Sequence, residues 1–143
     1  QGVVVRAVSR RLSNGRMAVV GAVLLAVSML LVPFAPILGG PVPTLVGASG
    51  ALIALLIALA VLSGGNGLLT VGTTAMVSSA ASEEEQGSAF GVTQGAGSLG
   101  RTVGPPFMTA IYVLVYWAPF VLGAVLTLGV VGALVVLERR ASG

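Results

Sequence analysis

Arg101 is the residue whose position in this sequence most directly implies chemistry. It lies in the stretch SLGRTVGPPF, residues 98–107, inside a long segment that otherwise holds no charge. At helical spacing, Gln94 and Ser98 share its stripe. An arginine at the centre of a membrane-spanning helix costs roughly 2.5 to 3.5 kcal/mol on insertion scales, and such charges usually face a protein interior or a water-filled cavity. We therefore treat this stripe as a candidate cavity surface.

Arg101 needs a hydrogen-bond acceptor, and the sequence leaves its source open. None of the glutamates lies at its depth, because all flank the apolar segments: Glu83, Glu84, Glu85 and Glu138. The acceptor is then a substrate anion, backbone carbonyls freed near Pro105 and Pro106, or an acid in sequence outside this chain. The alternative without a ligand is that Arg101 binds local carbonyls and holds a kink at the prolines.

The residue types exclude the usual catalytic groups. The chain has no histidine and no cysteine, and its charges are seven arginines and four glutamates. No acid/base pair, activated nucleophile or metal-ligand cluster can be assembled inside the apolar segments. The sequence therefore predicts no enzyme, no cofactor and no metal site.

The composition is that of a membrane protein. Of the 143 residues, 56% are hydrophobic and 8% are charged, whereas about a quarter of a soluble domain is charged. A spanning helix needs about 20 largely apolar residues. We expect an all-α, polytopic membrane helix bundle with four transmembrane helices: 17–38, 51–80, 86–112 and 118–137.

The arginine distribution predicts how these helices are oriented. Arginines precede the first helix and follow the last one, and loops rich in arginine stay in the cytoplasm. With four helices, both ends of the chain are then cytoplasmic, including the loop 1–16. The net charge of +3 is interpreted as a signal of orientation in the lipid bilayer and not of nucleic-acid binding. The chain starts with glutamine and shows no signal peptide, so we expect part of a longer protein.

Two of the four helices carry polar stripes. On 51–80 one face holds Ser63, Asn66, Thr70 and Thr73, and on 86–112 the stripe of Arg101 also holds Pro105, Gly87 and Gly91. The segments 17–38 and 118–137 are apolar nearly all round. We expect the two striped helices to line an interior, and the two apolar ones to enclose it and face lipid.

Small residues and prolines predict how these helices pack. Gly97, Gly100 and Gly104 form a stripe that lets another helix approach closely, and a sliding surface is the alternative. The adjacent prolines, Pro105 and Pro106, predict a kinked helix. The segment 63–67, SGGNG, is either a close helix crossing or an unwound stretch that presents Asn66 to a site.

The acidic run 83–85 resembles the start of a helix. Ser82 and Glu85 have the spacing of a capping box, and acids favour a helix N-terminus. The functional alternative is a salt-bridge latch between this run and the arginines before the first helix, Arg10, Arg11 and Arg16.

Taken together, these segments resemble the last third of a major facilitator superfamily transporter of the drug and tetracycline efflux type. The opening 2–16 loosely matches the basic loop between the eighth and ninth helices of that family, although its acid is absent. The better match is on 86–112, where efflux-type eleventh helices commonly place the same residues: Gly87, Gly91, Ser98, Arg101, Gly104 and Pro105.

The resemblance implies a secondary transporter of small molecules in the cell membrane that works by alternating access. It also implies that the direction of transport is efflux, commonly by antiport. It implies substrate contacts near mid-membrane from Arg101, Gln94, Ser98, Asn66 and Thr70, and a cytoplasmic gate at Arg10, Arg11 and Arg16. It also implies that the N-terminal part of the transporter lies outside this chain. Proton coupling is common in the family, but no carboxylate here is placed to carry a proton.

A second hypothesis is a complete four-helix membrane scaffold without transport activity. In that case the glycine stripes bind other helices, and Arg101 meets an acid on the partner. A small four-helix multidrug pump is disfavoured because such pumps need a membrane-embedded acid.

Overall fold

In the computed structural model, the described residues, 13–40 and 49–141, fold into helices without a strand. The elements are α2 (Asn14–Leu31), the short 3-10 helix η1 (Val32–Phe34), α3 (Ala35–Gly39), α4 (Gly50–Ala80), α5 (Gln86–Leu114) and α6 (Ala118–Ala141). The predicted all-α class is confirmed. Three segments are long and apolar enough to cross a membrane: Asn14–Gly39, Gly50–Ala80 and Ala118–Leu137.

Local sequence signals explain where these helices begin and end. Ser13 caps α2 by accepting a hydrogen bond from the Arg16 N–H at 3.4 Å, and Ser49 caps α4 by accepting one from the Leu52 N–H at 3.3 Å. Serine is among the preferred N-cap residues. The predicted helix 17–38 is divided, because Pro33 and Pro36 bring α2 to an end and leave η1 and α3 as short continuations.

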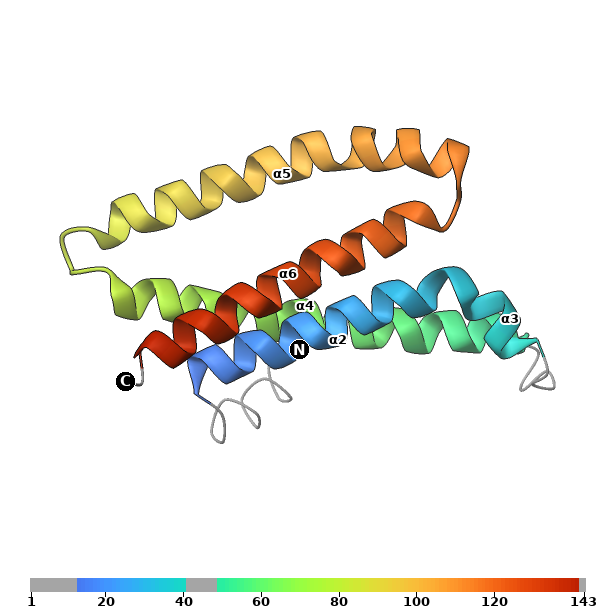
Figure 1. Ribbon diagram of the computed structural model, residues 1–143, viewed down its shortest axis with the longest axis horizontal. Helices are drawn as coiled ribbons and strands as arrows, with labels where there is room; N and C mark the ends of the chain where they lie inside the picture. Colours follow the sequence, from blue (N-terminus) through green and yellow to red (C-terminus); the bar gives the residue numbers. More distant parts are fainter. Residues whose placement is uncertain (1–12, 41–48, 142–143) are drawn as a thin grey trace.

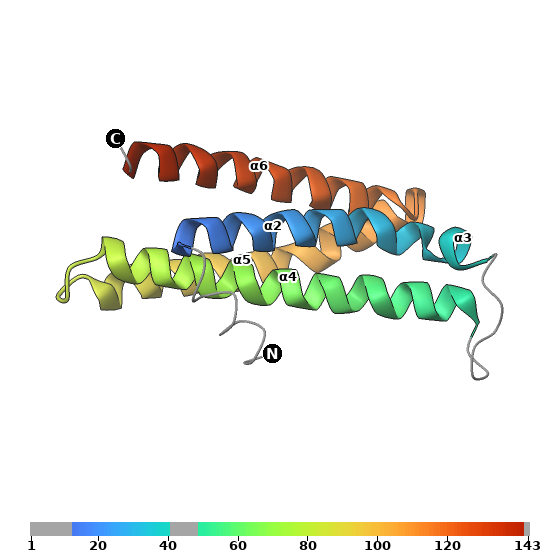
Figure 2. The same ribbon diagram turned by 90° about the horizontal axis from the view of Figure 1, so that it is seen from below.

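Close contact between α2 and α4 forms the centre of the fold (Figure 2). A Cβ atom added at Gly65 would lie 2.9 Å from the carbonyl oxygen of Gly21, and one added at Gly72 would lie 2.6 Å from the backbone nitrogen of Ala18. The two helices therefore approach backbone to backbone. Because α4 is continuous through 63–67, the close-crossing interpretation of that segment holds and the unwound alternative is wrong.

The helix α2 has protein neighbours on two sides. It lies between α4 and α6 and buries the largest share of its apolar length among the three candidate spans, 33% against 17% for each of the others. Its second neighbour is α6, where Met29 contacts Gly123. Small residues on more than one side allow this packing: Ala18, Gly21, Ala22 and Ala26 are all buried. Within the described residues, α2 is thus the central helix of the packed unit, and the expectation that 17–38 faces lipid stays a prediction.

The helix α5 stands apart from this three-helix unit (Figure 1). No residue of α5 is buried. Short connections join it to α4 at one end and to α6 at the other. It is long enough to cross a membrane but is not among the three segments that are apolar enough on their own, so its transmembrane course stays a prediction. The helix runs unbroken through Pro105 and Pro106, and its axis changes direction in its last third.

Candidate functional site

Arg101 lies near the middle of α5 and is exposed. Its side chain folds back along its own helix, because a Cβ atom added at Gly97 would lie 3.7 Å from each terminal guanidinium nitrogen. The missing side chain of Gly97 leaves the surface against which the planar group rests. Glu85, at the N-cap of α5, is about 24 Å away along the helix at a rise of about 1.5 Å per residue. The acid nearest in the α5 sequence is therefore out of reach.

The other predicted residues of α5 are also exposed. Ser98 lies one turn and Gln94 two turns before Arg101 on the same stripe. Two threonines of this helix are occupied locally: Thr93 donates its hydroxyl to the Ala89 carbonyl at 2.8 Å, and Thr102 donates to the Ser98 carbonyl at 3.0 Å. Such bonds to the preceding turn satisfy a hydroxyl without an external partner. Arg101 and Gln94 are thus the long polar side chains that this stripe can offer to a ligand.

The polar stripe of α4 lies away from its packed face. Asn66 and Thr70 are exposed, whereas the face toward α2 buries Gly65, Leu68 and Gly72. Thr73 is partly buried and donates to the Leu69 and Thr70 carbonyls at 2.7 and 3.1 Å. Four cavities lie among the described residues, and none of them is lined by a residue that we predict to contact substrate. A shared substrate site therefore stays a prediction for Arg101, Gln94, Ser98, Asn66 and Thr70.

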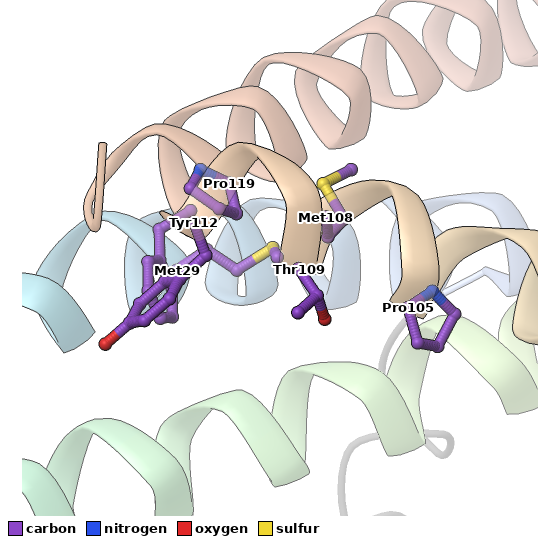
Figure 3. Close-up of a pocket in the computed structure, with 7 residues that line it drawn as sticks. Met29, Pro105, Met108, Thr109, Tyr112 and Pro119 are labelled. Atoms are coloured by element: carbon purple, nitrogen blue, oxygen red, sulfur yellow. The ribbon is translucent and has the colours of Figure 1, made fainter. Parts of the chain in front are cut away.

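Sequence reasoning missed a cavity where the end of α5 approaches α2 and α6 (Figure 3). It measures about 320 Å³ and is lined by Met29, Pro105, Met108, Thr109, Tyr112, Pro119 and Phe120. Two methionines and two aromatic rings give it a polarizable, adaptable lining. The cluster of aromatic residues near 112–120 is the sequence signal that could have indicated it.

Part of the predicted cytoplasmic gate lies within the described residues. Arg16 is exposed in the first turn of α2, whereas Arg10 and Arg11 lie outside the described residues. The acidic run 83–85 forms a turn before α5. A gate or latch that joins these arginines to the glutamates stays a prediction.

The predicted capping box at the start of α5 is only half right. Ser82 and Glu85 do meet, but the Ser82 hydroxyl donates to the Glu85 carboxylate at 2.9 Å. The serine does not accept a backbone N–H, and the N-cap residue of α5 is Glu85, whose side chain makes no capping hydrogen bond to the helix. The acidic residues therefore shape a turn that precedes the helix.

The glycine stripes of α5 are uncovered. Among the described residues, nothing lies within 4 Å of a Cβ atom added at Gly87, Gly91, Gly95, Gly100 or Gly104. At Gly97 the neighbour is Arg101 itself. The prediction that these glycines receive another helix is therefore left untested.

These features define the class of protein: an all-helical membrane protein in which a tightly packed unit of three apolar helices carries a fourth helix with an exposed basic stripe. The family model of the Major Facilitator Superfamily matches residues 2–143, and the chain belongs to that family of membrane transporters for small molecules. Neither a comparison with curated proteins nor one with solved structures finds a match.

Proposed function

We propose that this chain supplies the last four transmembrane helices of a secondary active transporter that exports small molecules by alternating access. The observation that carries the proposal is the exposed stripe of α5, with the guanidinium of Arg101 lying over Gly97 and no acid near it on its own helix. The efflux direction rests on the resemblance of 86–112 to efflux-type helices.

The energetics of α5 support an interior position. A helix that exposes Arg101 and Gln94 at mid-length is expensive to surround with acyl chains. The same helix becomes acceptable when its polar stripe faces a water-filled passage and its remaining surface meets protein. The N-terminal part of the transporter would supply that protein, and substrate would bind between the two parts near mid-membrane.

The packing suggests which parts move together. Close backbone contact between α2 and α4, with α6 on the other side of α2, favours a unit that moves as one body. The helix α5 is attached to this unit near its ends, so it can tilt with less disruption of packed contacts. Arg16, together with Arg10 and Arg11, would form contacts of the cytoplasmic gate in one of the two states.

Replacement of Arg101 tests the proposal in the full-length protein. A transporter-deficient bacterial strain that carries the wild-type protein would first be screened against inhibitory compounds to find a substrate. Arg101→Ala should lower efflux of that substrate at least tenfold while membrane insertion and protein level stay normal. Leu99→Ala, on the apolar side of the same helix, is the matched control and should retain efflux. Normal efflux by Arg101→Ala would count against a cavity role.

The scaffold hypothesis makes a different prediction in the same screen. A helix-binding scaffold without transport activity would protect the strain against no compound and would move no compound across reconstituted vesicles. Its Arg101 variant would instead lose a bound partner protein.

A further inference from the structure

We propose that Gly97 is a positioning residue that holds the guanidinium of Arg101 for substrates carrying a single carboxylate group. The inference rests on the proposed function, because it names the substrate class of the same α5 stripe. Gly97 acts through Arg101 and not by a contact of its own. The carboxylate would lie at the turn 97–98, between Arg101 and the side chains of Gln94 and Ser98.

Gly97 differs from other glycines of α5 in what lies beside it. A Cβ atom added there would lie 3.7 Å from each terminal nitrogen of Arg101 and 3.9 Å from the guanidinium carbon. At Gly95, Gly100 and Gly104, nothing among the described residues lies within 4 Å of the same added atom. A methyl group therefore just fits at position 97, whereas a longer side chain would compete with the guanidinium for the same space.

The distances also indicate how the guanidinium is turned. Its two terminal nitrogens are equally far from the atom added at Gly97, and the guanidinium carbon is slightly farther. The edge that carries both terminal nitrogens therefore faces the turn before Arg101. This edge is one that binds a carboxylate through two parallel N–H bonds. Gln94 lies on the same stripe in that direction.

Three polar side chains of the stripe have no partner within 13–40 and 49–141. In these ranges, no hydrogen bond or ion pair involves the guanidinium of Arg101, the amide of Gln94 or the hydroxyl of Ser98. Thr93 and Thr102 are different, because each hydroxyl donates to a carbonyl of the preceding turn. The stripe thus presents three sets of donors whose acceptor comes from outside the described part of the chain.

The charge of the stripe favours a ligand with one negative charge. Arg101 is the one charged residue of α5, and Gln94 and Ser98 are neutral donors. The guanidinium balances the single charge of a carboxylate, whereas a dianion keeps a charge that no described residue of the stripe compensates. A cationic ligand is repelled, and a neutral one leaves the guanidinium without a counter-charge. A monocarboxylate is therefore the ligand that this stripe fits.

Protection of Arg101 from phenylglyoxal tests this geometry in the purified full-length protein. Benzoate and benzamide are similar in size and differ in charge, and sulfate is the dianion. Benzoate should protect Arg101 in wild type at lower concentration than benzamide or sulfate. Gly97→Leu should raise the benzoate concentration for half protection about tenfold, the effect of losing one hydrogen bond to a charged group. Gly97→Ala should raise it less. Gly95→Leu, the same substitution on the opposite side of α5, is the matched control and should behave like wild type.

A second pair of variants covers the case in which Gly97→Leu does not fold. Gln94→Leu removes a donor of the stripe and should also weaken protection by benzoate about tenfold. Thr102→Val removes a hydroxyl that is already bonded within the helix, so it should leave protection unchanged. Equal protection by benzoate and by benzamide or sulfate in wild type would overturn the carboxylate assignment. Equal protection by benzoate in a folded Gly97→Leu and in Gly95→Leu would overturn the positioning role.

Efflux measurements separate this proposal from the proposed function. For a carboxylate substrate and its carboxamide, Gly97→Leu should raise the KM of the carboxylate and leave that of the carboxamide unchanged, whereas damage to the fold would impair both. Wild type that exports no compound, while benzoate still protects Arg101, would count against transport and support the carboxylate site. Equal efflux of carboxylate and carboxamide by wild type would leave transport intact and contradict the carboxylate site.

Discussion

Arg101 and Gly97 form the local unit on which the candidate site depends. The guanidinium lies against the helix backbone at Gly97. Its charge is therefore held close to the axis of α5, where a ligand bound against this helix would contact it. A guanidinium offers five N–H donors in a planar fork that suits carboxylates and phosphates. The chemistry of this position therefore favours a substrate with an anionic or strongly accepting group.

Access of water to Arg101 is the most direct prediction at this scale. Phenylglyoxal, a water-soluble reagent for arginine, should modify Arg101 in native membranes, because the proposed passage is hydrated. Peptide mass spectrometry would separate this site from the other arginines, and Arg16, which is exposed in the first turn of α2, serves as the positive control. Modification of Arg101 only after the protein has been unfolded would contradict a wet interior.

The crossing of α2 and α4 depends on particular glycines. An added methyl group at Gly65 would meet the backbone at Gly21 and Leu25, each at 2.9 Å, and backbone atoms cannot swing aside as a side-chain end can. At the adjacent Gly64, nothing among the described residues lies within 4 Å of the same added atom. Alanine substitutions at these two neighbouring positions therefore separate the effect of helix packing from the effect of replacing glycine by alanine in a helix.

Gly65→Ala should destabilise the full-length protein by about 1 to 3 kcal/mol, the usual cost of overpacking a close contact. Gly64→Ala should be neutral or stabilising by up to about 1 kcal/mol, because alanine favours a helix over glycine. Thermal unfolding in detergent would measure both. Equal effects at the two positions would show that the α2–α4 contact is not the one described here.

The sequence predicts where the helices lie better than it predicts which helices pack together. Serine caps, prolines and the acidic run are local signals. The observed α4 (Gly50–Ala80) and α5 (Gln86–Leu114) lie close to the expected ranges 51–80 and 86–112, whereas α2 ends at Leu31, before the expected residue 38. The central position of α2 had no such signal, because an apolar surface on all sides is compatible with either lipid or protein contact. The cavity of Met29, Met108 and Phe120 joins residues that are far apart in sequence, so no local pattern could reveal it.

The whole molecule has two ends of different chemistry. The start of α2 and the ends of α4 and α6 meet at one of them, and Tyr112, Tyr116 and the start of α6 lie toward the other. The span Asn14–Gly39 contains 26 residues. A helix that crosses a membrane needs about 20 largely apolar residues, so the two ends of this span can reach opposite surfaces.

Cysteine labelling would test this topology. The chain has no cysteine, so Asn14→Cys and Val42→Cys can each be introduced into a full-length protein freed of other cysteines. A membrane-impermeant maleimide should label Val42→Cys in intact cells and Asn14→Cys only after permeabilisation, because the arginines beside position 14 favour the cytoplasmic side. Labelling of both from the same side would require Asn14–Gly39 to re-enter or lie along the membrane, and the predicted topology would then be wrong.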